Sequence, residues 1–233
     1  MSALKILSGG AAHGLVAGLA PRFRALTGLD IEGEFGAVGV MANKLRDGTR
    51  ADIVVLTAAI VADLARENLV TGSSIADIGR VETALAVRAG DPPVAASDAA
   101  TLRAAFLAAD AIFVPDTKTS TAGIHVASVL AKLGIADQVA DRLKIFPNGA
   151  TAMRNLAACS AARPLGCTQS TEIISTDGVK LSGALPKGYD LATVYTAAIV
   201  TNADKAEQAQ ALIDLLTRTE QRELRRRAGF LDA

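Results

Sequence analysis

Short apolar runs recur along the chain, and each ends in small polar residues where a helical pattern begins. The first three runs lead into Ser8-Gly9-Gly10, Gly36-Ala37-Val38-Gly39 and Thr57-Ala58. Apolar residues after each junction recur at the spacing of a helix. Strands that alternate with helices in this way are joined by crossovers and run parallel. The first part of the chain therefore predicts a parallel sheet, with strands at 4–7, 31–35 and 52–56.

A second set of units follows the stop signal Asp91-Pro92-Pro93. A half-buried strand is predicted at 82–88, before this stop, and Ser97 is the expected N-cap of the helix after it. The apolar pattern then predicts strands at 111–115, 143–146, 164–167 and 179–185, with helices at 119–133 and 151–161. An apolar strand at 195–201 and a long terminal helix complete the chain.

These units predict an α/β protein with two lobes, each a mostly parallel sheet flanked by helices. We expect lobe 1 to comprise residues 1–81 and 190–233, and lobe 2 to comprise 82–189. Lobes joined by two crossings of the chain can hinge over a ligand cleft. One larger doubly wound sheet is the alternative.

Composition excludes several function classes. The 233 residues carry 24 basic and 24 acidic side chains, and aromatics make up 3% with no Trp. A neutral chain with few aromatic rings does not favour nucleic-acid binding. Two cysteines form neither a disulfide framework nor a metal-ligand cluster, so we expect no metal and no cofactor.

The start of the chain and its hydropathy give an expectation about location. Met1-Ser2-Ala3 leads directly into a strand that contains Lys5, without the pattern of a signal peptide. No stretch approaches the roughly 18 apolar residues of a membrane span. We expect a cytoplasmic protein without membrane insertion, or a periplasmic one if a leader has been removed.

The junctions between strands and helices suit an anion. In parallel sheets ligands bind beyond the carboxyl ends of the strands. Helix N-termini offer unpaired N–H groups and partial positive charge at the same place. We therefore expect a small anionic ligand there.

The order of several short motifs resembles that of the molybdate-type substrate-binding proteins of ABC transporters. The motifs are Ser8-Gly9-Gly10, Phe35-Gly36-Ala37-Val38-Gly39, Ala51-Asp52-Ile53-Val54-Val55, the segment 119–133, and Tyr195-Thr196-Ala197-Ala198-Ile199-Val200. This resemblance implies a two-lobed, type II periplasmic-binding-protein fold that clamps an oxyanion or another small ligand. It also implies an ABC permease as partner if the protein is exported. Val38 stands where the family has a Ser, which removes one hydroxyl donor and favours a carboxylate over molybdate.

The candidate ligand-binding residues come from both predicted lobes. In lobe 1 they are Ser8, Gly9, Gly10, Val38 and Thr57, with Tyr195 as the match to the family's ligand-contacting Tyr. In lobe 2 they are Ser120 and Thr121 at a helix start, and Thr168 and Gln169 at the end of a strand. Helix capping or core packing would explain each residue taken alone.

The fold family also contains soluble relatives with other functions, and the chain resembles the aconitate isomerases, which are carboxylate isomerases similar in sequence to molybdate-binding proteins. An enzyme is therefore the second hypothesis. An isomerase moves a proton on a di- or tricarboxylate and needs a base. His13 is the first candidate, because it follows the Ser8 loop and a helix start favours neutral imidazole. Glu172 is a weaker candidate. A cytoplasmic ligand sensor is a third hypothesis, which no motif supports.

Overall fold

The computed structural model describes residues 3–232 and divides the chain into two compact units. Unit 1 comprises Met1–Val81 and Thr193–Ala233, and unit 2 comprises Glu82–Ala192. Both are mixed α/β structures, as predicted. Each unit is described by itself below.

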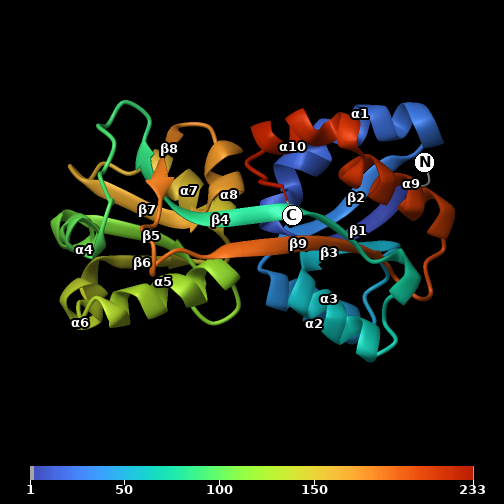
Figure 1. Ribbon diagram of the computed structural model, residues 1–233, viewed down its shortest axis with the longest axis horizontal. Helices are drawn as coiled ribbons and strands as arrows, with labels where there is room; N and C mark the ends of the chain where they lie inside the picture. Colours follow the sequence, from blue (N-terminus) through green and yellow to red (C-terminus); the bar gives the residue numbers. More distant parts are fainter. Residues whose placement is uncertain (1–2, 233) are drawn as a thin grey trace. The chain divides into compact units, whose positions relative to one another are not determined.

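The sheet of unit 1 has the strand order β2-β1-β3-β9. Strands β1 (Ala3–Gly9), β2 (Asp30–Gly36) and β3 (Ile53–Thr57) are parallel, and β9 (Ala192–Ile199) runs antiparallel to β3 (Figure 1). The parallel arrangement predicted for the first three strands is confirmed. Their apolar runs lie in one continuous core that also includes β9.

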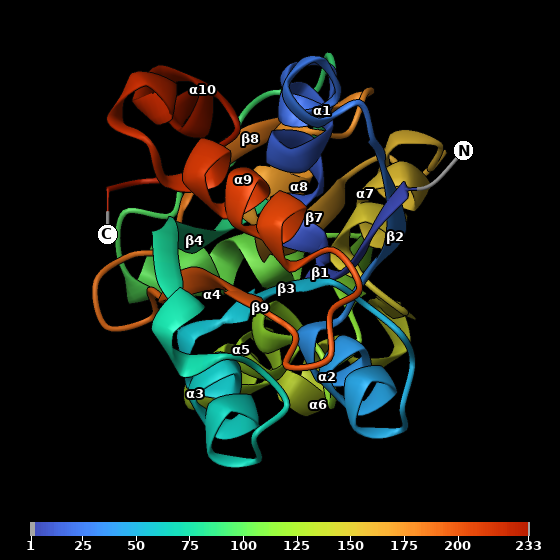
Figure 2. The ribbon, with the colours of Figure 1, turned by 90° about the vertical axis from the view of Figure 1, so that its right-hand side faces the viewer.

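Helices cover both faces of this sheet. Helices α1 (His13–Thr27), α9 (Ala206–Thr217) and α10 (Arg222–Arg227) lie on one face, and α2 (Val38–Arg46) and α3 (Ala58–Arg66) lie on the other (Figures 1 and 2). Gly28 ends α1 in the left-handed conformation, with φ of 74°. No helix within residues 3–232 has the length and apolar character needed to cross a bilayer.

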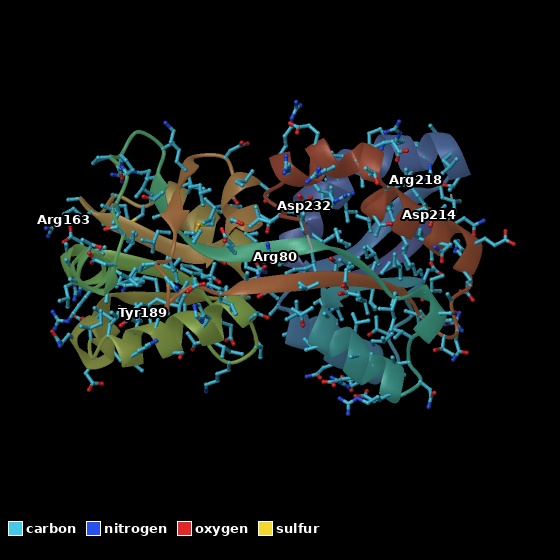
Figure 3. All side chains as sticks on the ribbon, in the orientation of Figure 1. Arg80, Arg163, Tyr189, Asp214, Arg218 and Asp232 are labelled. Atoms are coloured by element: carbon cyan, nitrogen blue, oxygen red, sulfur yellow. The ribbon has the colours of Figure 1, made fainter. Side chains whose placement is uncertain are left out.

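The C-terminal segment closes unit 1 by pairing with the first half of β4 (Ala76–Arg88). Arg80 exchanges two backbone hydrogen bonds with Leu231, at 2.9 and 2.8 Å, and its Nε donates to the Asp232 carbonyl at 3.0 Å (Figure 3). A Cβ on Gly79 would lie 2.5 Å from the Leu231 carbonyl oxygen, so this contact requires glycine. The strand thus begins six residues before the predicted start at 82.

The sheet of unit 2 has the order β4-β7-β5-β6, and β8 (Val179–Ala184) also pairs with β4. Strands β5 (Ala111–Pro115), β6 (Leu143–Phe146) and β7 (Pro164–Gln169) are parallel. Strand β4 runs antiparallel to β7 and to β8.

Two apolar clusters cover the opposite faces of this sheet. One cluster takes side chains from α4 (Ala99–Ala108), α5 (Thr121–Lys132) and α6 (Ala136–Val139). The other takes them from α7 (Gly149–Ala157) and α8 (Ser170–Ile174). The expectation of a half-buried strand at 82–88 is therefore wrong: Leu85 faces the first cluster and Ala84 the second, so both sides of β4 are covered.

The N-cap prediction for α4 is also wrong. Asp98, not Ser97, caps this helix, because its Oδ1 accepts the Thr101 N–H at 2.8 Å and the Thr101 hydroxyl accepts the Asp98 N–H at 3.1 Å. This reciprocal pair satisfies two N–H groups at once, which a Ser97 cap could not do.

Candidate functional site

The carboxyl ends of the three parallel strands of unit 1 lie at one edge of its sheet. Gly9 of β1 is in register with Gly36 of β2, and Thr57 of β3 is opposite Tyr195 of β9. A helix follows each parallel strand there: the 3₁₀ turn η1 (Gly10–Ala12) and α1 after β1, α2 after β2 and α3 after β3. The candidate residues of unit 1 therefore gather at this edge.

Gly9 has closely packed neighbours at this edge. A Cβ on Gly9 would lie 2.7 Å from Cγ1 of Val38 and 2.8 Å from Cε1 of Tyr195. Val38 and Tyr195 are themselves buried. Glycine is required here by the approach of these two side chains, so three candidate residues from distant parts of the sequence meet.

The helices that begin at this edge lack side-chain caps. The N-cap residues of η1, α2 and α3 are Gly9, Ala37 and Thr57, and none of these three residues makes a side-chain capping hydrogen bond. Helix N-termini without caps leave N–H groups available to an acceptor from outside the helix. Three helix starts without side-chain caps therefore lie at this edge of unit 1.

The two hydroxyl candidates of unit 1 are both buried. Ser8 has no exposed surface, and its Oγ donates to the Gly9 carbonyl at 3.0 Å. Thr57 is 7% exposed and is the N-cap residue of α3. The Ser8 hydroxyl therefore bonds to the last residue of β1.

His13 is an exposed residue at the start of α1. Its ring packs edge to face against Phe35 at the end of β2, with the ring centroids 4.8 Å apart. His13 is the first residue of α1 and directly follows η1. The contact with Phe35 also positions the imidazole beside the end of a second strand.

In unit 2, helix α5 begins after an ordered turn at the carboxyl end of β5. The Asp116 carboxylate accepts the N–H groups of Lys118 and Thr119 at 2.9 and 2.7 Å and the Thr119 hydroxyl at 2.8 Å. These bonds, led by the Thr119 hydroxyl, lower the pKa of Asp116 below its ordinary value. Ser120 is the N-cap residue of α5, and no described side chain caps the helix.

The start of α5 is packed directly on the end of β5. A Cβ on Gly123, in the first turn of the helix, would lie 2.1 Å from the carbonyl oxygen of Asp116 and 2.6 Å from that of Pro115. Only a glycine permits this contact. The position of Ser120 and Thr121 is therefore fixed by backbone-to-backbone packing.

The remaining candidates of unit 2 lie at the end of β7, on opposite faces. Thr168 is opposite Ala84, which belongs to the core on the α7 side, and Gln169 is opposite Thr83. Thr168 is fully buried, and its hydroxyl donates to Oε2 of Glu172 at 2.6 Å.

The Glu172 carboxyl is held inside unit 2. It is 6% exposed and accepts hydrogen bonds from the N–H groups of Gln169, Ala150 and Gly149 as well as from Thr168. Burial raises the pKa of the Glu172 carboxyl above its ordinary value of 4.5, and the hydrogen bonds act in the opposite direction. Gly149 was not among the candidates predicted from the sequence, although the Asn148-Gly149 pair before an Ala-rich helix marks a helix start.

Because the pKa of Glu172 is raised, we expect this carboxyl to make the free energy of unfolding depend on pH. Glu172→Gln removes this contribution. The native carboxyl binds its proton more tightly than the unfolded one, so this group's contribution to stability is full below pH 4.5 and falls as pH rises through the raised pKa. The free energy of unfolding of the wild type, relative to Glu172→Gln, should decrease as pH rises above 4.5. Urea unfolding at a series of pH values measures this, and a difference independent of pH would contradict it.

A polar cavity lies elsewhere in unit 1. It has a volume of about 460 Å³ and its lining includes Lys5, Arg50 and Asp52, so it lies at the amino ends of β1 and β3. The buried Asp52 carboxylate accepts the N–H groups of Lys5 and Lys205, at 2.8 and 3.0 Å. Asp52 thus connects β1 to the N-cap residue of α9. None of the candidate residues from the sequence lines the cavity.

Comparisons with known proteins agree with this arrangement. Aconitate isomerase of Pseudomonas sp. is 24% identical over 225 residues, which cover 93% of this chain and 82% of that protein. The molybdate-binding protein ModA of Escherichia coli K12 is 24% identical over 218 residues, which cover 91% and 82%. The periplasmic molybdate-binding protein of Azotobacter vinelandii has the same fold, with a TM-score of 0.82, 17% identity and 99% of each chain covered.

The family comparison extends over nearly the whole chain. The model for bacterial extracellular solute-binding proteins matches residues 4–231. This match includes every strand end and helix start described above. The chain belongs to the family of bacterial extracellular solute-binding proteins.

Proposed function

We propose that this protein binds a small carboxylate through the helix N-termini at the strand ends of its two units. The observation that carries the proposal is the set of uncapped helices at these ends: η1, α2 and α3 in unit 1 and α5 in unit 2, counted within residues 3–232. Membership of the solute-binding family supports an anionic or other small solute as the ligand.

Val38 is the reason for preferring a carboxylate to a tetrahedral oxyanion. It is the first residue of α2 and is packed against Gly9, so its side chain offers no donor where a serine would. A tetrahedral oxyanion presents four oxygens and needs several converging donors. A carboxylate group has only two oxygens, and the backbone N–H groups of a helix start can satisfy both.

We expect carboxylates to raise the melting temperature of the protein more than molybdate does. An unpaired oxygen in a dry site costs roughly 1–3 kcal/mol, or about tenfold or more in affinity. The measurement is a thermal-shift screen with mono-, di- and tricarboxylates against molybdate, tungstate and sulfate, because a ligand of the native state raises the midpoint.

Val38→Ser is the matched variant for this screen. It restores a hydroxyl at the same position and is expected to improve molybdate binding relative to the wild type. A strong molybdate response in the wild type, without any response to carboxylates, would contradict the proposal.

A second function, isomerisation of a carboxylate, is favoured by one observation. His13, an exposed imidazole, lies beside the uncapped start of η1 and against Phe35. Such a group can accept a proton from carbon and return it, while the neighbouring N–H groups stabilise the carbanion-like charge that develops on the substrate. Aconitate isomerase of Pseudomonas sp. is among the relatives. Incubation with cis- or trans-aconitate, followed by NMR, tests this function directly.

Transport is the alternative use of the same binding site. A solute-binding protein that is exported delivers its ligand to an ABC permease, and this partner follows from the family rather than from any surface described above. Binding without turnover in the NMR experiment supports the transport role.

A further inference from the structure

The N-terminus of α7 is satisfied from within the protein, unlike that of α5. Its first two N–H groups, from Gly149 and Ala150, donate to the Glu172 carboxyl. The next two donate to Asn148, one to its side chain at 2.9 Å and one to its carbonyl at 3.0 Å. The N–H groups of Gly149, Ala150 and Thr151, which have no acceptor inside the helix, thus have acceptors outside it, and the Ala152 N–H makes the first intrahelical bond.

The surroundings of the Glu172 carboxyl are those of a bound anion. Donors converge on it from the starts of α7 and α8 and from the Thr168 hydroxyl. No Lys, Arg or His within residues 3–232 lies in ion-pair distance of it, so the hydrogen bonds take the place of a counter-ion. Donors that converge in this way form an anion-binding pocket.

Gly149 shows that the pocket is shaped around the carboxyl group. A Cβ at this position would lie 1.9 Å from Oε2 of Glu172 and 2.2 Å from Oγ1 of Thr168. The space that a side chain would fill at the first residue of α7 is thus taken by the carboxyl of another helix.

We propose that Glu172 is a tethered ligand and a specificity-determining residue. Its carboxyl fills a carboxylate-sized pocket at the start of α7, so that an external carboxylate can bind unit 2 only at the start of α5. The claim that the Glu172 carboxyl fills this pocket does not depend on the proposed function. The claim that an external carboxylate binds at the start of α5 rests on the proposed function.

The test is chemical rescue of Glu172→Ala with formate. This variant keeps the backbone donors and Thr168 but vacates the pocket. Formate is expected to raise its melting temperature by roughly 3–6 °C at about ten times its dissociation constant. Sodium chloride at equal ionic strength is expected to have a smaller effect.

Three control proteins test whether formate acts through the vacated pocket. The wild type and Glu172→Gln have filled pockets, and Glu207→Ala removes an exposed glutamate, so the excess effect of formate over chloride should be smaller in each of them than in Glu172→Ala. If Glu172→Ala is unfolded in chloride, the recovery of its far-UV circular dichroism in formate is measured instead. An excess of formate over chloride on Glu172→Ala that is no larger than on the wild type, or equal circular dichroism in formate and chloride if the variant is unfolded, would overturn the filled pocket.

The role of Glu172 in specificity is tested by a separate measurement. Acetate titrated calorimetrically into Glu172→Ala is expected to show one more binding site than in the wild type. If the wild type binds carboxylates and the variant gains no site, the specificity role of Glu172 is refuted. If the wild type binds no carboxylate at all, the proposed function fails, while rescue by formate still establishes the filled pocket.

Discussion

Replacement of His13 with alanine is expected to lower the rate of aconitate isomerisation by about 10²–10⁴-fold, the usual contribution of a general base. His13 is the exposed imidazole at the start of α1, and its ring is positioned by Phe35. The backbone donors around Ser8 and Gly9 remain in the variant, so the carboxylate-induced rise in melting temperature should persist. Turnover by NMR and thermal shift with the same carboxylate measure the two effects.

His125→Ala is the matched histidine control. The His125 ring bonds to the Tyr189 carbonyl at 2.7 Å through Nε2, a structural contact within unit 2. Its loss should lower the melting temperature and leave turnover by the folded protein unchanged. Equal turnover in wild type and His13→Ala would place the base elsewhere, and an absence of turnover in the wild type would refute the isomerase function.

Replacement of Phe230 with alanine is expected to lower the free energy of unfolding by about 3–5 kcal/mol. The Phe230 side chain is 1% exposed and packs edge to face against Tyr195, with the ring centroids 6.2 Å apart. Its truncation leaves a cavity in unit 1 beside the ring that contacts Gly9. Urea unfolding followed by circular dichroism measures the loss.

Leu231→Ala is the control for Phe230 because it changes the next residue of the same segment. Leu231 is 41% exposed, and its backbone bonds to Arg80 do not depend on its side chain. Its substitution should stay within about 0.5 kcal/mol of the wild type. Equal losses for the two variants would show that the segment is held by its backbone rather than by the buried ring.

The strands and their order along the chain were largely predictable, because each buried strand is a short apolar run that ends in small polar residues. The first half of β4 was not predicted. Gly79 and Arg80 interrupt its apolar pattern, and its partner Leu231 lies at the other end of the chain. Local sequence holds no information on such a pairing.

The sequence predicted which strand ends carry the candidate residues. It did not predict which of their side chains contact one another. The junctions after Gly9, Thr57 and Ser120 follow from hydrophobic pattern and capping. The approach of Val38 and Tyr195 to Gly9 depends on tertiary packing. The burial of Glu172 was unforeseen because an isolated glutamate is usually exposed, and here its donors come from another helix.

Calorimetric titration of the wild-type protein with molybdate, and with the carboxylate that gives the largest thermal shift, tests the central claim most directly. We expect saturable binding of the carboxylate at one site, with an affinity at least about tenfold higher than that of molybdate. Tight binding of molybdate, together with no heat from any carboxylate, would contradict the proposal that this protein binds a carboxylate through its helix N-termini.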